Sequence, residues 1–138
     1  MSTTTPPNPP KLTDVARSAS VDIATATEAL LPFLQSDDRP TAVVAYHDPI
    51  ALGALCAARR LGLRVPADLS VTGFDDSFGE VADPPLTSVS HAPLEIARAA
   101  VELFLELRDS QGSPAPQTSR LVVVTPRLIV RASTGPAL

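Results

Sequence analysis

The sequence predicts a single α/β domain with a parallel sheet flanked by helices, and three observations support this prediction. Two short apolar runs, 41–45 and 70–74, each end at a polar pair, and a helix-like segment lies between them. A helix that connects two apolar strands favours a parallel βαβ unit. The length of 138 residues fits one domain with a sizeable core.

The N-terminal third is expected to hold a tail and two short helices. Residues 1–10 are mostly Ser, Thr and Pro without an apolar period, which indicates a flexible tail. Residues 11–36 contain two helical patterns, with Thr13 and Asp22 as their N-caps. Pro32 is expected to end or kink the second helix, because proline lacks the N–H that a helix interior needs.

The centre of the chain carries the strongest local signals. A strand is predicted over 42–45, and Asp48-Pro49 is a strong helix start, with Asp48 as the expected cap. This helix should run to about Leu61, and Gly62 supplies a left-handed cap. The second strand follows at 70–74.

The C-terminal part is predicted as a third strand at 86–89 and a long helix that starts at Pro93. One face of that helix is apolar, with Leu94, Ala97, Val101 and Phe104. The remaining segments are expected to be a flexible linker at 109–119, strands at 121–124 and 128–130, and a disordered tail at 132–138.

Composition narrows the classes of protein that remain. The net charge of −4 argues against a broadly basic surface for nucleic acid. Cys56 is the only cysteine, so no internal disulfide forms, and its place in a predicted helix indicates a core residue. The sequence shows no membrane span and no secretion signal, so a cytoplasmic protein is expected.

Polar residues at the strand ends form the candidate ligand site. His47 and Asp48 follow the first strand, and Asp75 and Asp76 follow the second. Ligands of open parallel sheets bind just beyond the carboxyl ends of the strands, so these residues should face one crevice. His91, at the end of the third strand, joins them as a candidate, although a hinge role is the stronger expectation for it.

Each candidate also has a purely structural interpretation. Asp75 can accept hydrogen bonds from sugar hydroxyls, or it can be a turn residue. His47 can bind a ligand or simply end a strand, and the two interpretations have equal weight. Asp48 is expected to be a helix cap more than a ligand contact.

Four segments resemble the LacI/GalR family of bacterial transcription regulators. They begin with Arg-Pro-Thr-Ala-Val-Val-Ala-Tyr-His-Asp at 39–48, which continues into Ala-Leu-Gly-Ala-Leu at 51–55. Residues 61–76, ending in Gly-Phe-Asp-Asp, 83–87, with Asp-Pro-Pro-Leu-Thr, and 126–134 continue the resemblance in the same order.

The resemblance implies an effector-binding domain over 37–131, with the periplasmic-binding-protein-like fold, that binds a small molecule, expected to be a sugar. It implies a dimer whose DNA affinity responds to the effector. Asp75 matches the family's effector-contacting aspartate, whereas His47 stands where the family more often has asparagine. Compared with the family, most of one lobe is missing, so the chain resembles a shortened regulator.

The N-terminal helices also resemble the family's helix-turn-helix headpiece. On that interpretation Arg17, Thr25 and Thr27 are the candidate contacts to operator DNA. The surrounding charge is mostly acidic, and phosphate contacts dominate DNA affinity, so weak DNA binding is expected. Residues 24–34 equally resemble the helix that precedes the first strand inside the effector domain, and both assignments stay open.

Other classes of function are weighed against this prediction. No zinc-type Cys/His cluster and no phosphate-binding glycine loop is present, so neither catalysis, a metal nor a cofactor is expected. The chain could instead be a sugar sensor without DNA affinity, or an interaction fragment that pairs with a full-length relative. The apolar segments from Leu94 and at 121–124 are expected to be exposed, which favours self-association or such a partner.

Overall fold

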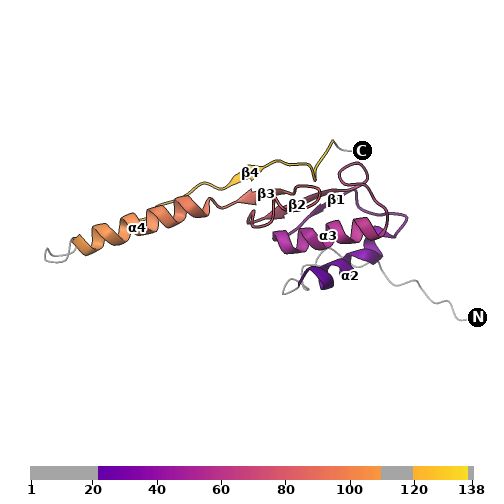
Figure 1. Cartoon of the computed structure of the whole chain (residues 1–138), viewed down its shortest axis with the longest axis horizontal. Coiled ribbons are helices and arrows are strands. Elements are labelled where there is room, and N and C mark those ends of the chain that lie inside the picture. Colours follow the sequence, from indigo (N-terminus) through magenta and orange to yellow (C-terminus); the bar gives the residue numbers. More distant parts are fainter. Residues whose placement is uncertain (1–21, 110–119, 137–138) are drawn as a thin grey trace, which may run out of the picture.

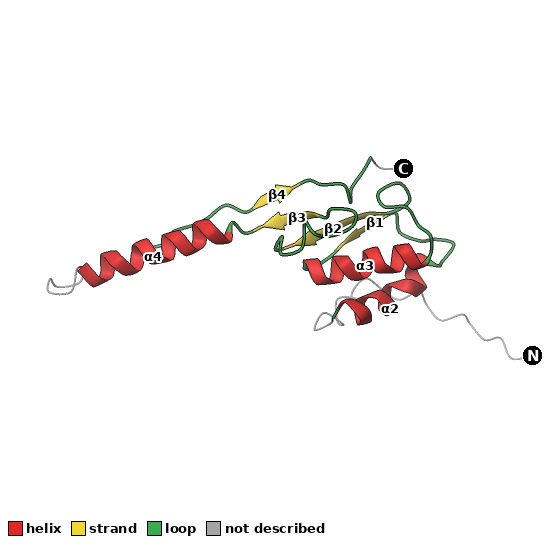
Figure 2. Ribbon diagram, viewed as in Figure 1, coloured by secondary structure: helices red, strands yellow, loops and turns green. Residues whose placement is uncertain are grey.

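The computed structural model describes residues 22–109 and 120–136. The elements follow one another as α2 (Ile23–Leu34), β1 (Ala42–Val44), α3 (Asp48–Arg60), β2 (Ser70–Phe74), β3 (Thr87–Ser90), α4 (Pro93–Asp109) and β4 (Arg127–Ile129). The strands form one sheet in the order β1-β2-β3-β4 (Figures 1 and 2). β1, β2 and β3 are parallel, and β4 is antiparallel to β3. The predicted α/β fold with a mostly parallel sheet is therefore confirmed.

Helix α3 connects β1 to β2, as predicted. Its N-cap is His47, whose Nδ1 accepts a hydrogen bond from the backbone N–H of Ile50 at 3.4 Å. The prediction that Asp48 is the cap was wrong by one residue, because the Asp48 side chain points into the core. The helix ends before Gly62, whose φ of 69° is the left-handed conformation that glycine adopts at low cost.

One apolar core lies between the sheet and helices α2 and α3. Leu69, Val71 and Leu86 are fully buried. The α3 face that packs on the sheet consists largely of alanine, namely Ala51, Ala54, Ala57 and Ala58, all fully buried. α2 packs on α3 and adds Leu30 and Leu34 to the same core. No helix in the two described ranges is long and apolar enough to cross a membrane.

Helix α4 lies outside this body. It extends away from the sheet, and the segment that leads to β4 runs back alongside it (Figure 1). No residue of α4 is buried. Leu94 is 72% exposed, Val101 57% and Phe104 65%. The predicted apolar face is therefore present and uncovered.

Three segments differ from their predicted structure. Pro32, which was expected to end or kink the helix, does not end α2, which continues to Leu34. Proline cannot donate to the carbonyl of Glu28, four residues earlier, and both residues are exposed. Residues 121–124 are not a strand, because no neighbouring strand pairs with them; β4 begins at Arg127. The predicted disordered tail instead contains the fully buried Ser133. The predicted 109–119 linker lies almost entirely outside the described residues.

Ser133 fixes the C-terminal segment to the sheet. Its hydroxyl donates to the carbonyl of Val71 at 2.6 Å and accepts from the N–H of Thr87 at 2.8 Å. Its own N–H donates to the carbonyl of Pro85 at 3.0 Å. The hydroxyl thus satisfies a buried carbonyl and a buried N–H at once, which is why the segment is ordered.

The turn before β2 is fastened by Asp68, which should make stability depend on pH. Hydrogen bonds from the side chain and backbone N–H of Arg64 hold the pKa of Asp68 well below its usual range. Because the pKa is lower in the folded state, the contribution to stability is complete above the unfolded pKa of about 4 and falls at lower pH. We expect Asp68→Asn to lower the urea midpoint at pH 7, with the difference from wild type shrinking between about pH 4 and about pH 2.5. A constant difference would contradict this origin.

Candidate functional site

The carboxyl ends of β1, β2 and β3 lie next to one another, as parallel pairing requires. Phe74 is the register partner of Val89, and the N–H of Asp75 donates to the carbonyl of Val89 at 2.9 Å. The ring of His91 meets the ring of Phe74 edge-on, with centroids 4.7 Å apart. The predicted meeting of the β2 and β3 ends is therefore present in the structure.

His47 stands at the end of β1 beside Tyr46, whose ring it meets at a centroid distance of 5.8 Å. Because Nδ1 accepts from Ile50, the neutral imidazole carries its proton on Nε2. The half-buried ring therefore has one nitrogen committed to the helix and one N–H free to donate. Both interpretations of His47, a structural residue and a ligand contact, are compatible with this geometry.

Asp48 is unavailable to a ligand. Its side chain is fully buried; Oδ1 accepts from the hydroxyl of Ser88 at 2.6 Å and Oδ2 from the N–H of Phe78 at 2.9 Å. Gly73 passes so close that a Cβ there would collide with Oδ1. The carboxylate therefore fixes α3 to β3 and to the loop after β2, and its prediction as an effector contact is corrected.

Asp76 is also engaged within the protein. Its Oδ1 accepts from Nη1 of Arg131 at 2.6 Å, and Oδ2 accepts from Nη2 at 3.3 Å. The side chains of Arg131 and Asp76 are 13% and 14% exposed, and Arg131 also donates to the carbonyl of Leu86. The hydrogen bond to Asp76 raises the pKa of Arg131. Arg131 was not among the predicted site residues, although it lies inside a segment that carries the family resemblance.

Asp75 retains one carboxylate oxygen that is able to accept a hydrogen bond. It is half-buried, and its Oδ1 accepts from the N–H of Ser77 at 2.9 Å. Asp75 and Asp76 have φ values of 92° and 57°, a rare pair of left-handed conformations that aspartate tolerates better than most residues. Such strain is typical of functional sites. In the described residues hydrogen bonds engage only Oδ1, so Oδ2 remains able to accept.

Of the residues considered for DNA contact, the structure describes Thr25 and Thr27, and the hydroxyls of both are engaged within the chain. Thr27 is 2% exposed, and its hydroxyl donates to the carbonyls of Ile23 at 2.7 Å and Gly53 at 3.2 Å. It is buried between α2 and α3, which excludes the predicted base contact. Thr25 donates to Asp22, the predicted helix cap, and these bonds lower the pKa of Asp22. Arg17 lies outside the described residues.

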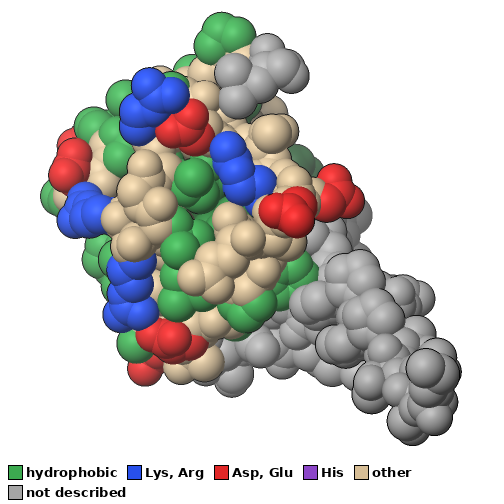
Figure 3. Space-filling view, turned by 90° about the vertical axis from the view of Figure 1, so that its right-hand side faces the viewer, with side chains coloured by type: hydrophobic (Ala, Val, Ile, Leu, Met, Phe, Trp, Pro, Cys, Tyr) green, Lys and Arg blue, Asp and Glu red, His purple; other side chains and the backbone are tan. Residues whose placement is uncertain are grey.

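Among the described residues, positive and negative side chains are interspersed on the end of the molecule opposite α4, and no single basic patch forms there. Figure 3 shows Lys/Arg and Asp/Glu side chains beside one another there, with apolar side chains between them. Arg59 pairs with Asp83, and Arg60 pairs with Glu28. Phosphate binding needs unpaired positive charge, so this face is a poor match for DNA.

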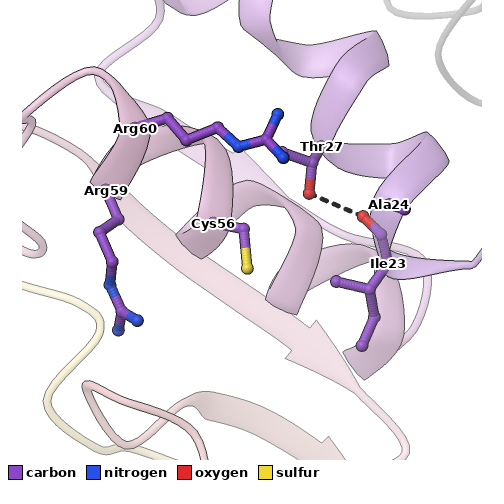
Figure 4. A pocket seen from close by; sticks show the side chains of 6 residues that line it. All are labelled: Ile23, Ala24, Thr27, Cys56, Arg59 and Arg60. Atoms are coloured by element: carbon purple, nitrogen blue, oxygen red, sulfur yellow. Dashed lines mark hydrogen bonds between the residues drawn. The ribbon is translucent and has the colours of Figure 1, made fainter.

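A hollow of about 470 Å³ lies between α2 and α3, away from the strand ends (Figure 4). It is lined by Ile23, Ala24, Thr27, Cys56, Arg59 and Arg60. Cys56 is exposed here, which corrects its prediction as a core residue. The described part of the chain holds no group of three or more His, Cys, Asp or Glu residues placed to bind a metal.

Comparison with known proteins identifies the family to which the chain belongs. The model of the periplasmic binding protein-like domain family matches residues 4–134. The transcriptional regulator MalR of Streptomyces coelicolor is 49% identical over 98 residues, covering 70% of this chain and 27% of its own length. The repressor CytR of Escherichia coli is 41% identical over 109 residues, covering 78% and 31%. The chain thus spans less than a third of these relatives.

Solved structures with a similar fold also include LacI family transcriptional regulators. A LacI family transcriptional regulator from Arthrobacter, crystallised with lactose, superposes with a TM-score of 0.70 at 35% identity, covering 83% of this chain and 42% of its own. One from Bifidobacterium animalis also gives 0.70, at 34% identity, covering 85% and 42%. These neighbours are regulators rather than enzymes.

Proposed function

Because this chain belongs to the family of periplasmic binding protein-like domains, we propose that it supplies one lobe of the effector site of a LacI-type, cytoplasmic regulator of transcription. Its effector is a small polyhydroxylated molecule, with sugars as the first class to test. The observation that supports the proposal is that His47, Asp75 and His91 follow the carboxyl ends of adjoining parallel strands, with the exposed ring of Phe74 against His91.

The side chains at this edge offer complementary chemistry. Oδ2 of Asp75 accepts hydrogen bonds, Nε2–H of His47 donates one, and the Phe74 ring offers an apolar surface. Sugars present hydroxyl groups that donate and accept together with apolar C–H faces, and binding sites pair an apolar lining with a few placed polar groups. Asp48 and Asp76 position this site without touching the ligand.

We assign α2 to this ligand-binding lobe rather than to a DNA-binding headpiece. Its contribution of Leu30 and Leu34 to the core and the burial of Thr27 against Gly53 support the assignment. Operator DNA remains a partner of the complete regulator, and α2 does not contact it. The affinity for duplex DNA, measured by fluorescence anisotropy, should therefore be unchanged by Thr25→Ala. A loss of affinity would favour the assignment of α2 to a DNA-binding headpiece.

Ligand binding is tested by thermal melts with pentoses, hexoses, lactose and nucleosides. A ligand at about 100 times its dissociation constant should add about 2.7 kcal/mol to the free energy of unfolding. Asp75→Ala is expected to abolish that gain, because the acceptor at the end of β2 is lost. Asp37→Ala, which removes an exposed carboxylate from a loop, is the matched control and should keep it.

Two results would contradict the proposal. The first is a folded chain that no member of the panel stabilises. The second is a stabilising ligand whose effect survives both Asp75→Ala and His91→Ala, because binding would then occur away from the strand ends.

A second candidate function, association with an intact relative, is favoured by one observation. α4 has no buried residue although it carries seven large apolar side chains. Copurification with a full-length regulator would support this alternative.

A further inference from the structure

Arg127 stands at the same edge of the sheet as the proposed ligand site. β4 runs antiparallel to β3, so its first residue lies beside the last residue of β3, and Ser90 is the register partner of Arg127. β3 is in turn level with β2, because Phe74 pairs with Val89 and the N–H of Asp75 donates to the carbonyl of Val89 at 2.9 Å. Asp75, Ser90 and Arg127 therefore form one row across this edge, over the adjoining strands β2, β3 and β4 of Figure 1.

The guanidinium group of Arg127 is not engaged by its own chain. Among the arginines of residues 22–109 and 120–136, only Arg98 and Arg127 make neither an ion pair nor a hydrogen bond. Arg98 lies on α4, more than one helical turn beyond the strand ends. Arg127 is exposed, and the carboxylate of Asp76 is already paired with Arg131. Arg127 thus places a free positive charge beside the proposed site.

The row combines an acceptor with two donors. Asp75 has a carboxylate oxygen that is able to accept. The Oγ of Ser90 accepts from the N–H of Ala92 at 3.3 Å, so its O–H remains able to donate. Neighbouring strands lie about 4.8 Å apart, which puts the backbones of Asp75 and Arg127 about 10 Å apart. The row suits a small ligand with hydroxyl groups at one end and a negatively charged group at the other.

From this row we propose that the effector carries an anionic group, a carboxylate or a phosphate, and that Arg127 binds it. The inference rests on the proposed ligand site and narrows its ligand to sugar acids and sugar phosphates. A guanidinium group donates two parallel hydrogen bonds to either anion, and such charge-assisted bonds are stronger than neutral ones. A neutral sugar offers no charged acceptor, so Arg127 discriminates between an acid and its neutral analogue.

The test is isothermal titration calorimetry of the full 138-residue chain with matched ligands. Glucose is compared with glucuronate and with glucose 6-phosphate, and lactose is compared with lactobionate. In at least one pair the acid should bind about 10-fold more tightly than the neutral sugar, a difference of about 1.4 kcal/mol. The carboxylate and phosphate arms show which anion is preferred. Added salt should weaken binding of the acid alone, because salt screens exposed charges.

Variants of Arg127 assign that preference to one side chain. Arg127→Gln should lower the affinity for the acid about 10-fold and leave the affinity for the neutral sugar unchanged, which a purely structural role would not do. Arg127→Lys keeps the charge but loses the planar fork, so it should retain part of the preference. If Arg127→Gln does not fold, Arg127→Thr takes its place, because strands favour threonine.

Arg60→Gln is the matched control. It removes the same charge from the last residue of α3, which lies at the opposite edge of the sheet because α3 runs back from the end of β1 to the start of β2. Both affinities should remain at their wild-type values in this variant.

Three results would overturn the inference, and they are distinct from one another. If no acid binds more tightly than its neutral partner while Asp75→Ala abolishes binding, the proposed ligand site stands and the anionic group is wrong. If the advantage of an acid survives Arg127→Gln, another residue binds the anion. If neither the acids nor the neutral sugars bind, the proposed ligand site fails together with this inference.

Discussion

Replacing Asp48 with alanine is expected to lower the free energy of unfolding by about 3–5 kcal/mol, among the largest effects of any single substitution in this chain. The carboxylate accepts from Ser88 Oγ at 2.6 Å and from the N–H of Phe78 at 2.9 Å, and it is fully buried. Alanine would leave both donors without their carboxylate partner, the Ser88 hydroxyl in a buried position and the Phe78 N–H in a part-buried one. Hydrogen bonds to charged groups contribute about 1.5–3 kcal/mol each, so the two together account for the range.

Urea unfolding of four variants tests this account. Ser88→Ala should cost less than Asp48→Ala, and the double variant should cost less than the sum of the two, because both lose the same bond. Asp37→Ala, at an exposed loop position, should change the free energy of unfolding by at most about 0.5 kcal/mol. A loss below about 1 kcal/mol for Asp48→Ala would show that the buried carboxylate contributes little to the fold.

The β1–α3–β2 unit could be predicted because its signals are local. Apolar runs, a proline at the start of a helix and Gly62 at its end each act within a few residues. The same local signals placed the N-cap on Asp48. They could not show that this side chain finds its partner 40 residues away, at Ser88.

The ordered C-terminal tail has the same physical origin, whereas the position of Cys56 has a local one. The tail at Ser133 is ordered by hydrogen bonds to Val71 and Thr87, which lie 62 and 46 residues earlier in the chain, and no local pattern encodes them. Cys56 was assigned to the core by residue type. In α3 it lies about 140° around the helix from the buried Ala51, so it faces outward.

The candidate site was predicted in part for a sound reason. Parallel strands bring their carboxyl ends together, so His47, Asp75 and His91 were expected at one edge. Sequence position alone cannot tell which carboxylate of the Asp75-Asp76 pair is engaged within the protein. That choice depends on Arg131, which engages Asp76 from 55 residues further along the chain.

The ion pair between Asp76 and Arg131 leads to the second large expected effect. Arg131→Met should lower the free energy of unfolding by about 2–4 kcal/mol, because it leaves the Asp76 carboxylate, only 14% exposed, without its partner. The expected loss in the free energy of unfolding is smaller than for a fully buried ion pair, because water still reaches both side chains. Arg60→Met, which breaks an exposed ion pair with Glu28, is the matched control and should cost less than about 1 kcal/mol.

A double variant distinguishes the stability that the ion pair contributes from the penalty of leaving one charge unpaired. Asp76→Asn combined with Arg131→Met removes both charges, and we expect it to recover part of the stability lost in Arg131→Met. No recovery would mean that the Arg131 hydrogen bond to the Leu86 carbonyl, rather than the ion pair, provides the stability.

The strained backbone of Asp75 precedes Asp76 directly, so losing the pair should also loosen the candidate ligand contact. Arg131→Met should then weaken the ligand-induced rise in melting temperature under conditions where the chain is still folded, whereas Arg60→Met should leave it unchanged.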